Sequence, residues 1–251
     1  MKIPGAHVIL RAVTNPLKNK YLVRGPWYVA AAVTVAACGG KQHVERPAPT
    51  APLPTAGLAA QQVSVLPLTL LAAEDSLHWE ALLGDRRAGL ARADSVIGAL
   101  LKARAPEVIW VLPDELRRAA RRAPGIAPDP DQMGTAILFR GEKLEMVPDP
   151  LRSELRTLAA LAGSGGGRYA LMPAGLIYRR SGGQADRRSV ASPEQPTARP
   201  PDRLRAIAEL TVVMADVRTG RIGFRTVARG EGDDPWTALT RAIKSLTPGL
   251  P

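Results

Sequence analysis

The clearest hydrophobic pattern in the chain lies at residues 206–231, where apolar and polar positions alternate as they do in β-strands. In residues 206–217 both alternating sets are apolar, which predicts a strand covered on both faces of a sheet. In residues 222–229 only one set is apolar, which predicts a strand nearer the rim. Between them Asp216 can accept backbone hydrogen bonds, and Gly220 can take the positive φ that a tight reversal needs. The stretch is therefore predicted to be a hairpin, with Asp216 as a turn former rather than a catalytic carboxylate.

Upstream, short apolar runs alternate with amphipathic stretches. Residues 63–71 form a β-rich apolar run that contains Pro67, which cannot donate to a ladder and marks an edge or a bulge. An amphipathic helix is predicted over residues 79–104, with an interruption at Gly84, followed by an apolar strand over residues 108–112. This strand–helix–strand order favours an α/β layer arrangement.

The second half continues the alternation of helices and strands. The pattern predicts a helix over residues 114–122, a short helix over 129–139, a brief strand over 143–147, a helix that begins at Asp149-Pro150, a strand over 168–178 and a final helix that begins at Asp234-Pro235. The glycine-rich residues 163–167 follow a helix and precede a strand, the reverse of a phosphate-binding loop, so they are predicted to be a helix stop. The predicted fold class is α/β (α+β): a single mixed sheet with a central antiparallel hairpin and helices packed on it.

Composition limits the function classes only loosely. Of the formal charge of +11, five positive charges lie in residues 1–37, which contain no acidic residue, so the rest carries 11 − 5 = +6. One cysteine excludes an intrachain disulfide and a Cys-x-x-Cys metal site. No metal or cofactor is predicted, and no nucleic-acid recognition motif or set of stacking aromatics accompanies the basic residues.

The amino-terminal region has the pattern of an export signal. Residues 27–37 form an uncharged run that is too short to cross a bilayer, for which a helix needs about 20 residues, but suits the apolar core of a secretory signal. The sequence Val-Ala-Ala-Cys at residues 35–38 resembles the lipobox of bacterial lipoproteins. An ordinary secretory signal that leaves a buried free thiol is the alternative.

The lipobox resemblance implies a covalent lipid anchor. It implies cleavage between Ala37 and Cys38, a diacylglyceryl thioether on the Cys38 sulfur and an acyl chain such as palmitate on its new amine. Stable anchoring needs at least two such chains, and no spanning helix is then required. Gly39 stands where an aspartate would favour inner-membrane retention, so the resemblance implies the outer membrane, facing the periplasm.

The domain organisation follows from these segments. Residues 1–37 are predicted to be the signal peptide and residues 38–61, which are rich in proline, a tether. About 20 residues of such a tether could extend roughly 60 Å at about 3.1 Å per residue. Residues 62–247 form the predicted α/β domain, with a disordered loop at residues 181–201.

The most basic predicted surface is on the helix at residues 114–122. Spacings of three and four place its four arginines on neighbouring rows of one surface: Arg117, Arg118, Arg121 and Arg122. Such a patch can bind an anionic partner, whether phospholipid head groups, a cell-wall polymer or an acidic protein. The alternative interpretation is a solvated helix face in an arginine-rich protein.

The order of elements resembles the amino-terminal domain of TolB and the related domains of CsgG-type and LpoB-type outer-membrane lipoproteins. The resemblance covers residues 62–247 and rests on residues 63–68 as first strand, 169–175 as the strand after the helices, and 208–221 with the Asp-x-Arg-Thr-Gly turn. Two features depart from the resemblance. TolB has a β-propeller after this domain, which these residues do not continue into, and the paired alternating segments that a membrane pore needs are not found.

These observations predict a membrane-anchored, non-enzymatic envelope interaction or assembly module. Its partners would be the membrane, through the lipid anchor, and an envelope protein or cell-wall component; the oligomeric state is not predicted. One alternative is an envelope hydrolase, which would have to use His78 or a carboxylate pair such as Asp94 with Glu115. A subunit of an oligomeric secretion complex is a second alternative.

Overall fold

The computed structural model describes residues 49–141, 143–162, 167–181 and 205–247. The predictions for the signal peptide, for Cys38 and for most of the glycine-rich stretch and of the loop at residues 181–201 lie outside these residues.

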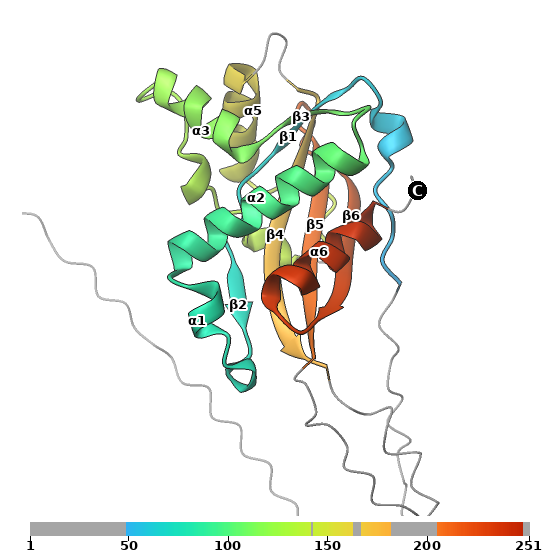
Figure 1. Ribbon diagram of the computed structural model, residues 1–251. Helices are drawn as coiled ribbons and strands as arrows, with labels where there is room; N and C mark the ends of the chain where they lie inside the picture. The colour runs from blue at the N-terminus through green and yellow to red at the C-terminus, as the bar shows by residue number, and fades with distance from the viewer. Residues whose placement is uncertain (1–48, 142, 163–166, 182–204, 248–251) are drawn as a thin grey trace, which may run out of the picture. The chain divides into compact units, whose positions relative to one another are not determined.

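One mixed sheet forms the centre of the described structure (Figure 1). Its strands are β1 (Gln62–Val65), β2 (Leu71–Ala73), β3 (Ile109–Val111), β4 (Tyr169–Arg180), β5 (Ala206–Asp216) and β6 (Ile222–Gly232). They lie in the order β3-β1-β4-β5-β6, with β2 beside the second half of β4. β1 runs parallel to β3 and β4, whereas β4, β5 and β6 are antiparallel. The predicted mixed sheet with a central antiparallel hairpin is confirmed, and β6 lies at one edge of the sheet.

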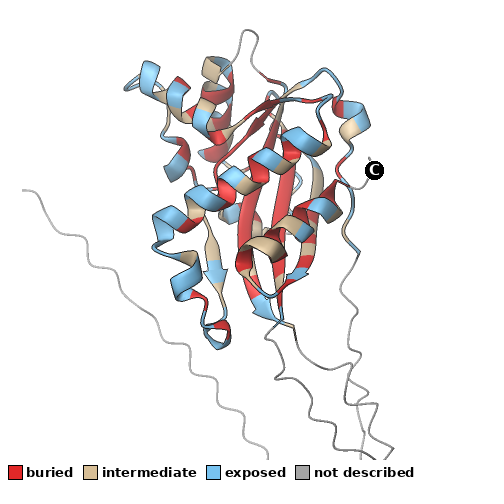
Figure 2. Cartoon of the chain, in the orientation of Figure 1, coloured by how far each residue is buried: buried red, intermediate tan, exposed pale blue. Residues whose placement is uncertain are grey.

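Helices cover both faces of this sheet. They are α1 (Glu80–Leu83), α2 (Arg86–Arg104), α3 (Pro113–Arg122), α4 (Ile137–Arg140), α5 (Leu151–Ala162) and α6 (Pro235–Leu246), with short 3₁₀ turns η1 (Thr55–Leu58), η2 (Asp75–Leu77) and η3 (Pro130–Gln132). α2 and α6 lie on one face, where Leu101 and Leu239 share a core with Leu210 of β5. α3, α4 and α5 lie on the other, where a second core includes Val213 of β5. β4 and β5 are therefore buried along most of their length (Figure 2), because side chains on both of their faces meet helices.

Three predicted elements differ in the structure. The first strand is divided into β1 and β2, because Pro67 cannot continue the ladder. The predicted helix over residues 129–139 is wrong: residues 133–136 separate η3 from α4, and among them Met133 has an extended backbone (φ −63°, ψ 130°) and a buried side chain. The predicted strand over residues 143–147 is only an isolated bridge between Met146 and Arg221.

The segment from Thr50 to Leu58, which the sequence placed in the tether, belongs to the packed body. Leu53 and Leu58 are buried in the core under α6, and the Leu53 amide donates to the Leu246 carbonyl at 2.9 Å. The Thr50 hydroxyl bridges the edge of β6: it donates to the Val227 carbonyl at 3.2 Å and accepts from the Arg229 amide at 3.3 Å. The segment thus covers part of the exposed edge of β6, a common way to protect an edge strand.

Candidate interaction surfaces

A buried carboxylate occupies the break between β1 and β2. The Leu66 amide still donates to the Leu171 carbonyl of β4, but Pro67 has no N–H and the chain then leaves the ladder. The next amide, that of Leu68, donates instead to Oδ1 of Asp94 at 2.8 Å. Asp94 lies on α2 and is 6% exposed. A side chain therefore satisfies a backbone donor that would otherwise be buried without a partner.

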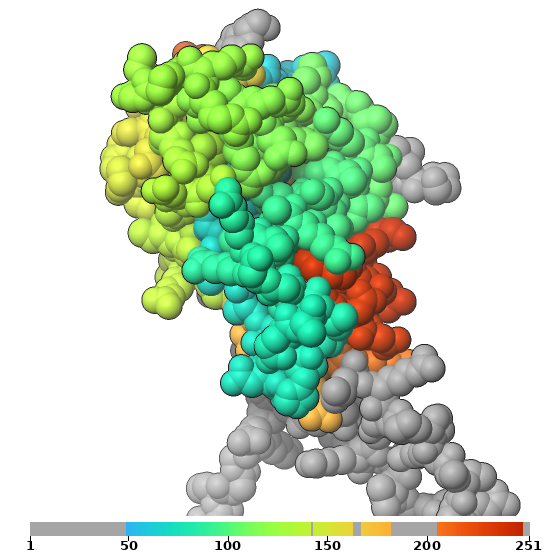
Figure 3. Space-filling model, turned by 60° about the vertical axis from the view of Figure 1, so that its left-hand side comes forward, coloured from blue at the N-terminus to red at the C-terminus, as the bar shows by residue number. Residues whose placement is uncertain are grey.

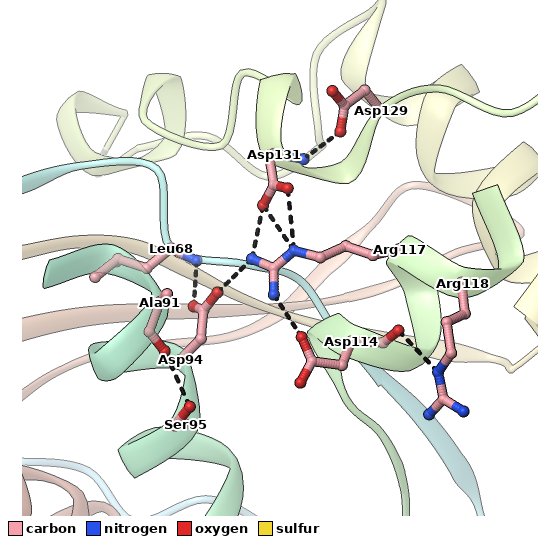
Figure 4. A network of polar contacts seen from close by, with 9 residues as sticks. All are labelled: Leu68, Ala91, Asp94, Ser95, Asp114, Arg117, Arg118, Asp129 and Asp131. Carbon is pink, nitrogen blue, oxygen red and sulfur yellow. Dashed lines mark hydrogen bonds and ion pairs between the residues drawn. The ribbon is translucent and has the colours of Figure 1, made fainter. Parts of the chain in front are cut away.

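Arg117 joins this carboxylate to two others (Figure 4). Its Nη2 lies 2.7 Å from Oδ2 of Asp94 and 2.7 Å from Oδ1 of Asp131, and its Nη1 lies 2.9 Å from Oδ1 of Asp114. The Nε also donates to both carboxylate oxygens of Asp131 at 3.0 Å. One guanidinium thus connects α2, α3 and the η3 turn.

The electrostatics of the pair reflect its burial. Burial raises the pKa of Asp94 to about 6, although the Leu68 amide and Arg117 both act to lower it. The hydrogen bond to Asp131 is the largest of the effects that raise the pKa of Arg117, so this guanidinium stays charged. Because three carboxylates surround one cation, Arg117 is committed to internal contacts, and its charge is not available to a partner as the predicted patch requires.

The other arginines of the predicted patch differ from Arg117. The Nε of Arg118 donates to the backbone carbonyl of Asp114 at 3.3 Å. Arg118, Arg121 and Arg122 are all exposed, and within the described residues none of them makes an ion pair. Just beyond the helix lies Ile126, which is 73% exposed. We call these four residues the α3 end. The segment that contains α3 forms part of the yellow-green surface in the upper part of Figure 3.

The residues considered for hydrolysis lie in ordinary structural roles. Asp94 is held by Arg117, and Glu115 lies 3.6 Å from the Nζ of Lys102, so each carboxylate belongs to a separate ion pair. His78 follows η2 with a left-handed backbone (φ 51°) and is exposed. Its ring makes no hydrogen bond within the described part of the chain.

A second basic surface surrounds the turn between β5 and β6. Oδ1 of Asp216 accepts from the amides of Arg218 at 2.9 Å and Thr219 at 3.0 Å, and Gly220 has φ 77°. Arg168 donates from its Nε to Oδ2 of Asp216 at 3.0 Å. Partial burial acts to raise the pKa of Asp216, but the hydrogen bonds from Thr219 and Arg168 outweigh it and lower that pKa.

Two arginines of α5 hold this turn from the other side. Arg156 donates from Nη2 to the Arg218 carbonyl at 2.6 Å and from Nε to the Val217 carbonyl at 3.3 Å. Arg152 packs against Gly220 so closely that a Cβ on the glycine would overlap the arginine Cδ. With the turn residues, the structure gathers five arginines from three parts of the chain, which we call the hairpin arginine cluster: Arg152, Arg156, Arg168, Arg218 and Arg221.

Sequence reasoning missed this cluster. Its members are spread over about 70 residues and show no common spacing, so only the tertiary fold brings them together. The sequence pointed to Asp216 and Gly220, which lie at the centre of the cluster. Arg168, Asp216, Arg218 and Thr219 line a shallow depression there. Another shallow depression is lined by Arg140, Gly141, Lys143 and Leu144.

None of the helices among the described residues has the length and apolar character needed to span a membrane.

Comparison with known proteins adds little to this description. Neither a family model nor a curated protein matches the chain. The LpoB C-terminal domain from Salmonella enterica is 14% identical, with a TM-score of 0.35 over 69% of this chain and 83% of that one. E. coli LpoB is 14% identical, with a TM-score of 0.33 over 92% and 96%. The PelC dodecamer from Paraburkholderia phytofirmans is 10% identical, with a TM-score of 0.32 over 80% and 94%. At such TM-scores these likenesses carry no argument about function.

Proposed function

We propose that this chain is a bacterial lipoprotein, anchored through Cys38 to the periplasmic side of the outer membrane, and that its body is a non-enzymatic docking module for an acidic envelope protein. The lipobox at residues 35–38 supports the anchor, and the α3 end supports the docking role.

The packed segment at Thr50 limits how far the body can lie from the membrane. From Cys38 to Thr50 there are 50 − 38 = 12 residues. Whatever their conformation, they span at most about 43 Å, because a fully extended chain reaches about 3.6 Å per residue. The proposed tether is therefore shorter than the sequence pattern indicated, and the module works close to the bilayer surface.

The α3 end carries the docking proposal. Arg118, Arg121 and Arg122 present charges without ion-pair partners in the described structure, beside the exposed apolar side chain of Ile126. Protein interfaces commonly combine an apolar anchor with arginines, which are enriched among the residues that dominate binding energy. The Arg117 contacts fix α3 against α2 and η3, so this surface is held in place before a partner binds.

The position of α3 also suits such a role. α3 packs over β1 and against α5, towards the β3 edge of the sheet. Thr50, where the proposed tether joins the body, lies at the opposite edge, on β6. The attachment point therefore leaves the α3 end accessible. A competing explanation is that Arg121 and Arg122 only complement the negative end of the helix dipole.

A matched pair of charge reversals distinguishes these explanations. R121E/R122E alters the α3 end, and R218E/R221E makes the same charge change in the hairpin arginine cluster. In cross-linking on intact envelopes, we expect a protein adduct of the wild type to disappear in R121E/R122E and to persist in R218E/R221E. The adduct should be recovered when R121E/R122E is paired with a partner whose acidic contact residues are changed to lysine. If the adduct persists in R121E/R122E, or both variants lose it equally, the docking role of α3 is contradicted.

A further inference from the structure

We propose that the hairpin arginine cluster is a second contact surface, which docks the body onto the anionic phospholipid head groups of the bilayer that holds the anchor. This inference rests on the proposed function, because it needs a bilayer within reach of the body.

The charge balance around the turn favours an anionic ligand. Five arginines belong to this cluster, and two carboxylates form ion pairs with them, those of Asp149 and Asp216. Counted over these residues, the balance is 5 − 2 = +3. A surface with this excess attracts phosphate groups, which arginine binds with paired hydrogen bonds.

The five arginines divide into two groups by their contacts. Arg156 and Arg168 hold the turn through the Val217 and Arg218 carbonyls and through Asp216. Arg152 is paired with Asp149 and packs against Gly220. Arg218 and Arg221 are exposed and make no ion pair within the described residues. The contacts of the first group fix the backbone of the turn that carries Arg218 and Arg221. The two guanidinium groups without ion pairs are therefore attached to a rigid segment.

An apolar side chain accompanies these two charges. Met146 forms an isolated antiparallel bridge with Arg221 and is 45% exposed. Surfaces that lie on a bilayer combine basic groups, which contact the phosphates, with apolar side chains, which enter the boundary below them. A docking site on the bilayer surface thus accounts for both the free arginines and the exposed methionine.

The proposed anchor also places an anionic bilayer within reach of this turn. Along β6, 227 − 221 = 6 residues separate Val227, which contacts Thr50, from Arg221. At about 3.3 Å per residue this is about 20 Å, whereas the proposed tether spans at most about 43 Å. Tethering keeps the head groups at a high effective concentration near the turn, so weak contacts suffice.

Hydrogen exchange of the mature lipidated protein in proteoliposomes tests this inference. Bilayers of phosphatidylethanolamine and phosphatidylglycerol (3:1) are compared with bilayers of phosphatidylcholine alone. We expect the amides of Arg218, Thr219 and Gly220 to exchange more slowly in the anionic bilayer. Each arginine near an anionic surface contributes roughly a fivefold change in affinity, so removing two lowers the docked-to-undocked ratio roughly 25-fold. R218E/R221E should therefore abolish the protection, and R121E/R122E should retain it.

Three results overturn the inference. Equal protection in both bilayers shows that charge is not responsible. Protection produced by inorganic phosphate without any bilayer assigns the site to a soluble anion. Absence of protection in both bilayers shows that the turn does not dock on a bilayer. The mass of the same purified protein reports the anchor independently: an unmodified mass contradicts the proposed function, whereas a lipidated protein without protection contradicts only the docking of the turn.

Discussion

The Nη2 of Arg117 lies 2.7 Å from Oδ2 of Asp94, and this contact joins α3 to α2 at the place where the sheet is interrupted. Because Oδ1 of the same carboxylate accepts from the Leu68 amide, Asp94 serves both the broken strand and the helix pair. The contact accounts for a buried charge on α2 and for the difference between Arg117 and the other arginines of α3.

Substitutions of Asp94 should separate its two tasks. D94A leaves the buried Leu68 amide without an acceptor, which costs about 1–3 kcal/mol. D94N keeps an oxygen for that amide and removes only the charge, while Arg117 retains Asp114 and Asp131. We expect D94N to be at least as stable as the wild type at neutral pH, because it keeps the Leu68 hydrogen bond and carries no buried charge. Urea denaturation measures both. Equal losses for the two variants would show that charge, rather than the Leu68 hydrogen bond, is what matters.

The raised pKa of Asp94 predicts a pH-dependent stability. The pKa of Asp94 is about 6 in the folded state, against an ordinary value of 3.8 for an aspartate in the unfolded chain. Between these values the folded state binds more protons than the unfolded state, so the contribution of Asp94 is full below about pH 3.8 and is lost as the pH rises through 6. The size of this change is about 3 kcal/mol. We expect the wild type to lose stability relative to D94N from pH 4 to pH 7 in denaturation curves, and parallel curves would contradict this.

The packing of Leu53 predicts that the segment before β1 stabilises the body. L53A removes a side chain that is 5% exposed, and such core truncations cost about 2–5 kcal/mol. P52A changes an exposed neighbour and serves as the control. Thermal and urea unfolding should show a large loss for L53A and little change for P52A. A neutral L53A would mean that the segment behaves as a free tether after all.

Gly220 predicts a loss with two separable parts. G220A forces an L-residue to φ 77°, which costs about 1–3 kcal/mol, and its Cβ also overlaps Arg152. Gly125 has φ 81° but no atom within 4 Å of its Cβ position, so G125A measures the backbone strain alone. We expect G220A to be the more destabilising, and G220A/R152A to recover the difference. Identical losses in G220A and G125A would show that the overlap with Arg152 costs nothing beyond the backbone strain.

The proposed anchor predicts a change of location when its attachment residue is replaced. C38A removes the sulfur that would carry the diacylglyceryl group, so the protein should lose the lipid mass and appear in the soluble fraction once the signal is processed. Fractionation and intact mass spectrometry check both. A wild-type protein with an intact, unmodified amino terminus upstream of Cys38 would rule out the anchor.

The sequence by itself determined the elements whose patterns are local. Both faces of residues 206–217 are apolar, and this predicted the covered position of β5 before any neighbour was known. The polar residue and the glycine at 216 and 220 likewise lie at a turn, because their chemistry acts within a few residues.

Only the tertiary structure decided the contacts between distant segments. Helical spacing put Arg117 with Arg121 on one surface, but Asp94 and Asp131 draw it inward, and no spacing within α3 can reveal carboxylates from α2 and η3. Leu53 and Leu58 lie in a stretch with the composition of a tether, and they are buried because α6, almost 200 residues later, provides an apolar surface. The hairpin arginine cluster has the same origin: local propensity formed α5 and the turn, and packing of the two brought their charges together.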